Sequence, residues 1–179
     1  MRKKRARSLA SPVKPQGDGL PSCRQSHSPE KAREYAFLLL KFRLRSEKEL
    51  LQRLRQKGFS EELCHDTVNF LKDREFIDDR VFAKGWVSSR LRRPFGLRRI
   101  RQELVQKGLD KEIIEETFVQ AKEDYDEAGI VRKLAEQRFS KLKGIEPLKA
   151  KQRVYAYLMR RGFSPDLIGG VLNKKYDSR

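Results

Sequence analysis

From Glu30 onward, apolar residues recur three and four positions apart, the spacing found along amphipathic helices. Tyr35, Ala36 and Leu39 form one such set. Runs of β-branched residues with alternating polarity, which would indicate strands, do not occur in this part of the sequence. The pattern predicts an all-α fold in which longer helices cover about 31–43, 79–92 and 126–141.

A short turn sequence occurs three times, at intervals of about 50 residues. In each copy a glycine suits the left-handed position that ends a helix, and the polar residue two places later can cap the next helix. The apolar residue between them can pack on the first turn of that helix, as Phe59 would on Cys64. The three copies are Lys57-Gly58-Phe59-Ser60, Lys107-Gly108-Leu109-Asp110 and Arg161-Gly162-Phe163-Ser164.

The helices ahead of these glycines also correspond. Apolar pairs such as Leu50 and Leu54 stand eight and four residues before the glycine in all three copies. Ser46 and Glu49 have the spacing of a capping box, in which each side chain accepts a hydrogen bond from the other residue's backbone N–H. Gly96 and the 145–147 region occupy the corresponding place in the second and third copies.

These signals divide the chain into a tail and three helical repeats. We expect a disordered basic tail at 1–29 and repeats at 30–75, 76–123 and 124–179. A repeat of three helices, which also describes a helix-turn-helix-like unit, has a thin core of its own. Neighbouring repeats should therefore lean on one another in an elongated array. The tail is open to two interpretations, an arm that grasps nucleic acid and a plain solubilising extension.

Composition indicates the kind of partner. The 179 residues include 42 Lys and Arg against 25 Asp and Glu, a formal net charge of +17. Such a chain is drawn to polyanions, above all nucleic acid or a protein assembled on it. No stretch approaches the roughly 18 apolar residues of a membrane-spanning helix. Two widely spaced cysteines and the lack of an apolar leader predict a cytoplasmic protein without disulfides.

Arginines crowd around one turn of the second repeat. Because like charges repel and Arg makes forked contacts with phosphate and carboxylate, this crowd favours a binding surface over a plain solvated face. No acidic residue interrupts the set, which consists of Arg90, Arg92, Arg93, Arg98, Arg99 and Arg101. A second basic cluster in the third repeat comprises Lys141, Lys143, Lys151, Arg153, Arg160 and Arg161.

In the first repeat, the charge is milder, because acidic Glu47 and Glu49 are interleaved with the basic residues Arg43, Arg45, Arg53 and Arg55. We therefore place the strongest patch for a nucleic acid or protein partner on the second and third repeats.

Residues that could carry catalysis are few. The sequence has no phosphate-binding GxxxxGK[ST] loop, and His65 has no neighbouring Cys or His with the spacing of a zinc site. Cys64 is expected to pack, and Asp78 and Asp79 to stabilise the start of a helix. Trp86 lies on an apolar stripe, which favours core packing over base stacking. We expect no enzymatic activity, no cofactor and no metal.

Several segments of the second repeat resemble bacterial RecX regulatory proteins, and the resemblance extends from about Glu30 to Tyr176. It implies three tandem three-helix repeats in an elongated, curved array. It also implies binding to the groove of RecA filaments on single-stranded DNA, with inhibition of their recombinase, ATPase and co-protease activities. The segments are Phe76-Ile77-Asp78-Asp79, Phe82-Ala83, Arg98-Arg99-Ile100-Arg101-Gln102-Glu103-Leu104 and Gln106-Lys107-Gly108-Leu109.

Two functional hypotheses follow. The first is a non-enzymatic, monomeric RecA regulator that binds the RecA–single-stranded DNA filament and binds nucleic acid directly only weakly. The alternative is a helix-turn-helix protein that reads a duplex DNA sequence through its second repeat.

Overall fold

The computed structural model describes residues 28–122 and 125–176, so most of the tail expected at 1–29 lies outside the described residues. Within these ranges the chain forms nine α-helices and no strand, as the all-α prediction requires. The first triplet contains α1 (Pro29–Phe42), α2 (Glu47–Lys57) and α3 (Glu61–Asp73). The second contains α4 (Asp79–Leu91), α5 (Leu97–Gln106) and α6 (Lys111–Lys122), and the third α7 (Glu127–Ser140), α8 (Pro147–Arg160) and α9 (Pro165–Tyr176).

The repeated turn sequence forms the same structure in every triplet. Gly58, Gly108 and Gly162 all have left-handed backbones, with φ of 97°, 84° and 85°. A side chain would be strained there, which explains why glycine stands at all three positions. Ser60 and Ser164 then accept hydrogen bonds from the backbone N–H groups of residues three positions on, each at 3.3 Å. The sequence prediction is confirmed for the three glycines and for the caps at Ser60 and Ser164.

Each triplet has its own hydrophobic core. The apolar pairs that precede the glycines lie inside these cores and are inaccessible to solvent: Leu50 and Leu54, Ile100 and Leu104, Val154 and Leu158. The apolar residues of the turns join the same clusters, as predicted for Phe59 with Cys64. The second helix of a triplet is thus fixed by packing on one face, and its other face is left for contacts outside the core.

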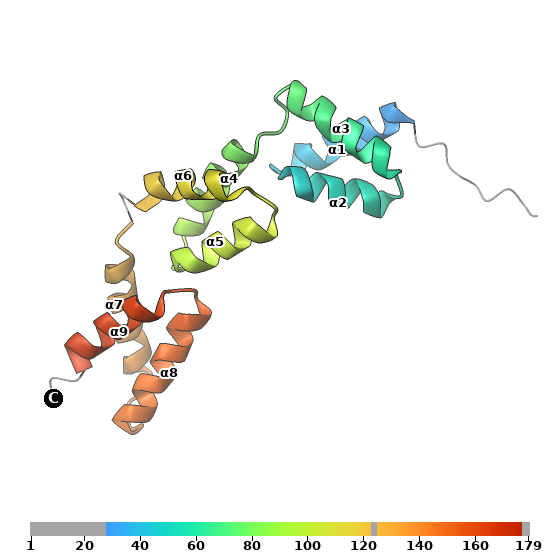
Figure 1. Cartoon of the computed structure of the whole chain (residues 1–179). Coiled ribbons are helices and arrows are strands. Elements are labelled where there is room, and N and C mark those ends of the chain that lie inside the picture. Colours follow the sequence, from blue (N-terminus) through green and yellow to red (C-terminus); the bar gives the residue numbers. More distant parts are fainter. Residues whose placement is uncertain (1–27, 123–124, 177–179) are drawn as a thin grey trace, which may run out of the picture.

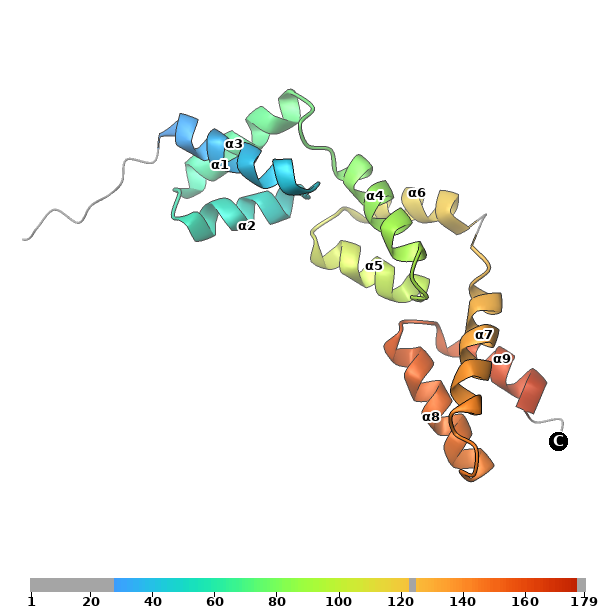
Figure 2. The same cartoon turned by 180° about the vertical axis from the view of Figure 1, so that it is seen from behind.

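The three triplets follow one another in an elongated, curved row (Figures 1 and 2). α2, α5 and α8 lie along the inner side of the curve in both views. Equivalent helices of the three repeats therefore line a single side of the molecule.

The junction between the first two triplets is made at the start of α2. The Ser46 hydroxyl donates a 2.7 Å hydrogen bond to the Lys107 carbonyl oxygen, at the end of α5. The backbone N–H of Glu47 donates to a carboxylate oxygen of Asp79, the first residue of α4, at 3.0 Å. Asp79 of the next triplet thus satisfies a backbone donor that α2 itself leaves unpaired, and the Lys107 carbonyl oxygen accepts from the residue that caps the helix.

The capping box predicted at Ser46 is only half present. Ser46 accepts from the backbone N–H of Glu49 at 3.3 Å, as expected. The Glu49 carboxylate instead accepts from Arg43 at 2.8 Å and from the Lys107 ammonium of the second triplet at 2.6 Å. The two cations attract this side chain more strongly than a neutral backbone N–H does, because hydrogen bonds between charged groups are the stronger ones.

The second junction repeats the arrangement of the first. The Gly96 N–H, at the start of α5, donates to the Arg161 carbonyl oxygen at 2.9 Å, and the Leu97 N–H donates to the Glu127 carboxylate at 2.9 Å. Glu127 is the first residue of α7, as Asp79 is of α4. A β-carbon at Gly96 would lie 2.2 Å from the Gly162 backbone, so glycine permits direct backbone contact where Ser46 uses its hydroxyl.

Candidate interaction surface

Acidic residues pair with three of the six arginines around the turn between α4 and α5. Arg90 and Arg99 bind the two carboxylate oxygens of Glu103, at 2.7 and 3.1 Å. Arg101 pairs with Glu115 of α6. Helix packing thus brings in acids from outside the stretch in which the arginines occur, Glu103 of α5 and Glu115 of α6, so the mutual repulsion expected of these arginines is partly relieved. That they bind a partner stays a prediction.

The other three arginines remain exposed on the surface. Arg92 and Arg93 follow the end of α4, and Arg98 lies in the first turn of α5. None of the three forms a salt bridge within residues 28–122 and 125–176. Their guanidinium groups can donate forked hydrogen bonds to a carboxylate or a phosphate of a partner.

The cations predicted for the third triplet come from two parts of it, the turn after α7 and helix α8. Lys141 and Lys143 are exposed at the turn after α7, whereas Lys151 and Arg153 lie on α8. Arg160, in the last turn of α8, is exposed near the second junction. All remain predicted contacts for a partner.

Arg161 has a structural contact that the sequence did not indicate. Its guanidinium donates to the Pro94 carbonyl oxygen at 3.1 Å and lies 5.0 Å from the centre of the Tyr157 ring. Its own carbonyl oxygen accepts the Gly96 N–H. Arg161 therefore helps to hold the second and third triplets together, beside any role in binding a partner.

Trp86 is half-buried at the first junction. Its ring stacks on Phe82, with centroids 5.8 Å apart, which agrees with the predicted packing role. Two cations lie over the ring, the Arg90 guanidinium 4.3 Å and the Lys107 ammonium 4.1 Å from its centroid, and the indole N–H donates to Glu103 at 3.0 Å. The indole is thus held by both cation–π and hydrogen-bond contacts beside a polar cavity.

Charge pairing controls the ionisation of the acids at the first junction. Partial burial acts to raise the pKa of Glu49, but hydrogen bonds from Arg43 and Lys107 outweigh it and lower that pKa to about 2. Burial raises the pKa of Asp79 to about 6, against the hydrogen bond from the Glu47 N–H and with added repulsion from the Glu47 carboxylate. Asp79 therefore titrates near neutral pH at the contact between two triplets.

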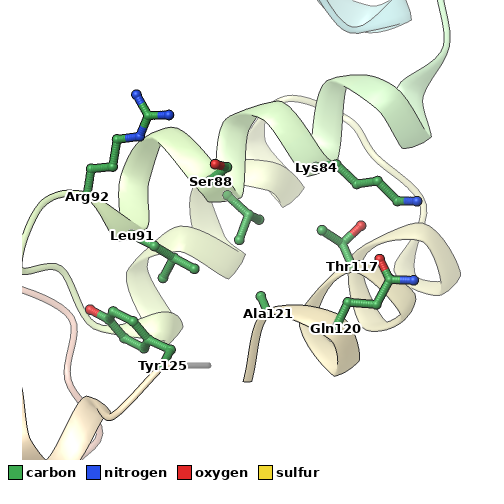
Figure 3. A pocket seen from close by; sticks show the side chains of 9 residues that line it. Lys84, Ser88, Leu91, Arg92, Thr117, Gln120, Ala121 and Tyr125 are labelled. Carbon is green, nitrogen blue, oxygen red and sulfur yellow. The ribbon is translucent and has the colours of Figure 1, made fainter. Parts of the chain in front are cut away.

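On the opposite face of α4 from Trp86, a hollow of about 530 Å³ opens between α4 and α6 (Figure 3). Val87, Leu91 and Ala121 supply its apolar floor, while Lys84 and Arg92 extend from α4 at its margins. At one end the Tyr125 hydroxyl donates to the Phe95 carbonyl oxygen at 2.8 Å. Among the described residues that line the hollow, none is an acid or a histidine that could act as a general base.

The residues considered for catalysis have structural contacts. Asp78 caps α4 by accepting from the Arg80 N–H at 2.6 Å. His65 is exposed and lies 2.9 Å from Glu61, and burial raises the pKa of the buried Cys64 thiol. Among the described residues, no group of three or more His, Cys, Asp or Glu side chains could hold a metal ion. None of the helices described there has the length and apolar character to cross a bilayer.

Sequence reasoning missed a third group of arginines, in the first triplet. Arg43, Arg45 and Arg53 line a single cavity of about 210 Å³ together with Glu49 and two glutamines. The interleaved acid Glu47 lies elsewhere, paired with Lys72 at 2.8 Å. The helical spacing of Glu49, Gln52, Arg53 and Gln56, a wholly polar stripe, is the signal that would have located this site.

Models of the RecX family match all three triplets. The first three-helix domain of RecX matches residues 32–71, the second residues 78–117 and the third residues 125–172. Two solved structures have the same fold. A regulatory protein RecX has a TM-score of 0.71 and 24% identity, with coverage of 81% of this chain and 71% of that one. RecX from Lactobacillus salivarius has a TM-score of 0.69 and 23% identity, with coverage of 82% of this chain and 95% of that one.

Curated relatives agree with the domain matches. The regulatory protein RecX of Chlorobium phaeobacteroides is 37% identical over 150 residues, which cover 83% of this chain and 96% of that protein. The regulatory protein RecX of Thermotoga petrophila is 37% identical over 146 residues, which cover 81% and 84%. With every triplet matched in order and most of both chains aligned, this chain belongs to the RecX family of regulatory proteins.

Proposed function

We propose that this chain is a non-enzymatic, cytoplasmic and monomeric regulator of RecA recombinase. It binds the groove of the RecA filament on single-stranded DNA and inhibits strand exchange, ATP hydrolysis and the co-protease reaction. Membership of a family named for regulation supports this proposal. The observation that carries it is the extended, curved body, whose inner side presents equivalent helices from three triplets. Such a body can contact several subunits of a polymer at once.

The basic surface supplies the attraction. Arg92, Arg93 and Arg98 are exposed near the middle of the molecule, and Arg153 and Arg160 extend positive charge along α8. Binding across the joints between RecA protomers needs no chemical step, because a ligand that binds one filament state better than another shifts the equilibrium between them. Inhibition then follows from binding energy alone.

The alternative hypothesis, a reader of duplex DNA sequence, receives less support. In a helix-turn-helix unit the helix after the tight turn enters the major groove. In the second triplet that helix is α6, whose exposed side chains include Glu112 and Glu116. DNA phosphates would repel these carboxylates, so α6 is poorly suited to the groove.

A RecA ATPase assay on single-stranded DNA tests the proposal. Substoichiometric amounts of the protein should lower the steady-state rate of ATP hydrolysis, and an unchanged rate would contradict the proposed function. Arg98→Glu should weaken inhibition, since its side chain is exposed and unpaired. Lys31→Glu, an equal charge change at the start of α1 and far from the basic surface, is the matched control and should inhibit like the parent protein.

A further inference from the structure

The second helices of the first two triplets carry polar stripes at equivalent positions, with the acid and the arginine exchanged, and neither core uses them. On α2 the stripe consists of Glu49, Gln52, Arg53 and Gln56. The residues 50 positions later on α5 are Arg99, Gln102, Glu103 and Gln106. A spacing of three, four and seven residues places all members of a stripe on one face of the helix. Both glutamines thus recur at equivalent positions of the repeat.

Three cavities follow these stripes from one triplet to the next. The cavity of about 210 Å³ on α2 shares Glu49 and Gln52 with one of about 350 Å³ at the first junction. That second cavity shares Glu103 and Gln106 with a third, of about 340 Å³, at the second junction. Because neighbouring cavities share lining residues, they lie next to one another in a row that crosses both junctions, and we call this row the inner furrow. It runs along the inner side of the curve, where α2, α5 and α8 lie (Figures 1 and 2).

Positive charge dominates the inner furrow. Its two carboxylates are each held by two cations, Glu49 by Arg43 and Lys107, and Glu103 by Arg90 and Arg99. The remaining cations of the furrow form no salt bridge with any acid in the described ranges: Arg45, Lys48, Arg53 and Arg160. The acids in the furrow therefore stabilise their neighbours and leave a surplus of positive charge for a ligand.

The arginines of the first cavity lie close enough to affect one another. Partial burial lowers the pKa of Arg45, and the nearby charges of Arg43 and Arg53 lower it further. The Nε–H group of Arg45 donates to the Leu39 carbonyl oxygen at 3.3 Å, which fixes the base of the guanidinium. A bound anion would relieve this repulsion, and three guanidinium groups can surround the oxygens of a phosphate.

We propose that the inner furrow binds an extended single strand of nucleic acid, and that Arg43, Arg45 and Arg53 form a phosphate site at one end of it. The glutamine amides can both donate to and accept from base edges, and Trp86 lies midway along the strand's path. A row of small cavities along a curved surface suits a single strand, because a flexible backbone can follow the curve whereas a rigid duplex resists bending. The inference deepens the proposed function by assigning the strand to a surface of this chain, but it is tested without RecA.

The test measures binding of the whole chain to a fluorescently labelled oligothymidylate by anisotropy. Arg53→Glu should weaken binding about tenfold, since it removes one charge-assisted contact. It should also reduce the slope of log affinity against log salt by at least about 0.7, the value per single-strand phosphate. Lys84→Glu makes the same charge change on the opposite face of α4 and is the matched control. Its affinity should remain well above that of Arg53→Glu.

A second readout uses Trp86, the single tryptophan of the sequence. Its intrinsic fluorescence should change as unlabelled oligothymidylate fills the furrow, with the same midpoint as the anisotropy titration. Equal losses in the Arg53→Glu and Lys84→Glu variants would overturn the proposal, because they would indicate a diffuse effect of net charge. Displacement of the oligonucleotide by pyrophosphate or by polyglutamate at equal charge concentration would also overturn it, in favour of a small-anion site or an acidic-peptide site. If Arg53→Glu lost strand binding but still inhibited RecA, the inner furrow would bind the strand as proposed, and the inhibition of RecA would not depend on it.

Discussion

Ser46 is the residue at which removal of one oxygen atom should disturb two triplets. Its hydroxyl caps α2 by accepting from the Glu49 N–H and also donates to Lys107 across the first junction. The side chain is inaccessible to solvent, so water cannot replace either contact. Loss of the cap costs about 1 kcal/mol, and loss of the second hydrogen bond costs about 0.5–1.5 kcal/mol more. We therefore expect Ser46→Ala to lower the free energy of unfolding by about 1.5–2.5 kcal/mol.

Ser60→Ala is the matched control, because Ser60 caps α3 through a hydrogen bond of the same length but has an exposed side chain with no partner in another triplet. It should cost only about 1 kcal/mol. Urea unfolding followed by circular dichroism measures both variants. Trp86 emission in the native state should shift in Ser46→Ala only, since Lys107 packs 4.1 Å from that ring. Equal stability losses, with Trp86 emission unchanged in both variants, would refute the proposed cap between triplets.

Three further predictions concern single positions. Gly162→Ala should lower the free energy of unfolding by about 1 kcal/mol or more beyond the loss in Gly144→Ala. Both glycines have left-handed backbones, but a β-carbon at Gly162 would lie 2.1 Å from Arg99 of the second triplet, whereas one at Gly144 would meet nothing. Equal urea midpoints for the two variants would contradict the tight second junction. In the parent protein, the free energy of unfolding should fall as pH rises from about 4 to about 6, because the Asp79 carboxyl holds its proton more tightly in the folded than in the unfolded state. Asp79→Asn should abolish this fall. Parallel curves of stability against pH for the two proteins would exclude this role of Asp79. Leu104→Ala should lower the free energy of unfolding by about 2–5 kcal/mol, because Leu104 is buried. Val105→Ala, at an exposed neighbour, should change it by no more than about 0.5 kcal/mol. A small effect at Leu104 would contradict its place in the core.

Local signals in the sequence predicted most of the fold. Gly58, Gly108 and Gly162 are required by backbone geometry that depends only on adjacent residues, so their repetition marked the ends of three helices. The buried pairs, such as Ile100 and Leu104, follow from helical spacing within one element. Such short-range rules locate elements and their inward faces, which is why helix bounds agree with the structure within a few residues.

Contacts between triplets could not be predicted in the same way. The hydrogen bond from the Glu47 backbone N–H to the Asp79 carboxylate joins residues 32 positions apart. The bond from the Ser46 hydroxyl to the Lys107 carbonyl oxygen joins residues 61 positions apart. Which charges meet depends on how helices pack. The arginine crowd therefore looked unopposed in sequence, although Glu103 neutralises part of it. One signal for these contacts was present in the sequence: an acidic residue, Asp79 or Glu127, is the first residue of the first helix in both the second and the third triplet.

The central claim is that three triplets, joined in a fixed curve, bind along a nucleoprotein filament and contact more than one of its subunits. The stoichiometry of binding tests this most directly. RecA filaments assembled on single-stranded DNA with a non-hydrolysable nucleotide are titrated with the protein, and the bound amount is measured by co-sedimentation. Saturation at fewer than one copy per RecA protomer is the predicted result. Saturation at one copy per protomer, or no binding to the filament, would contradict the account.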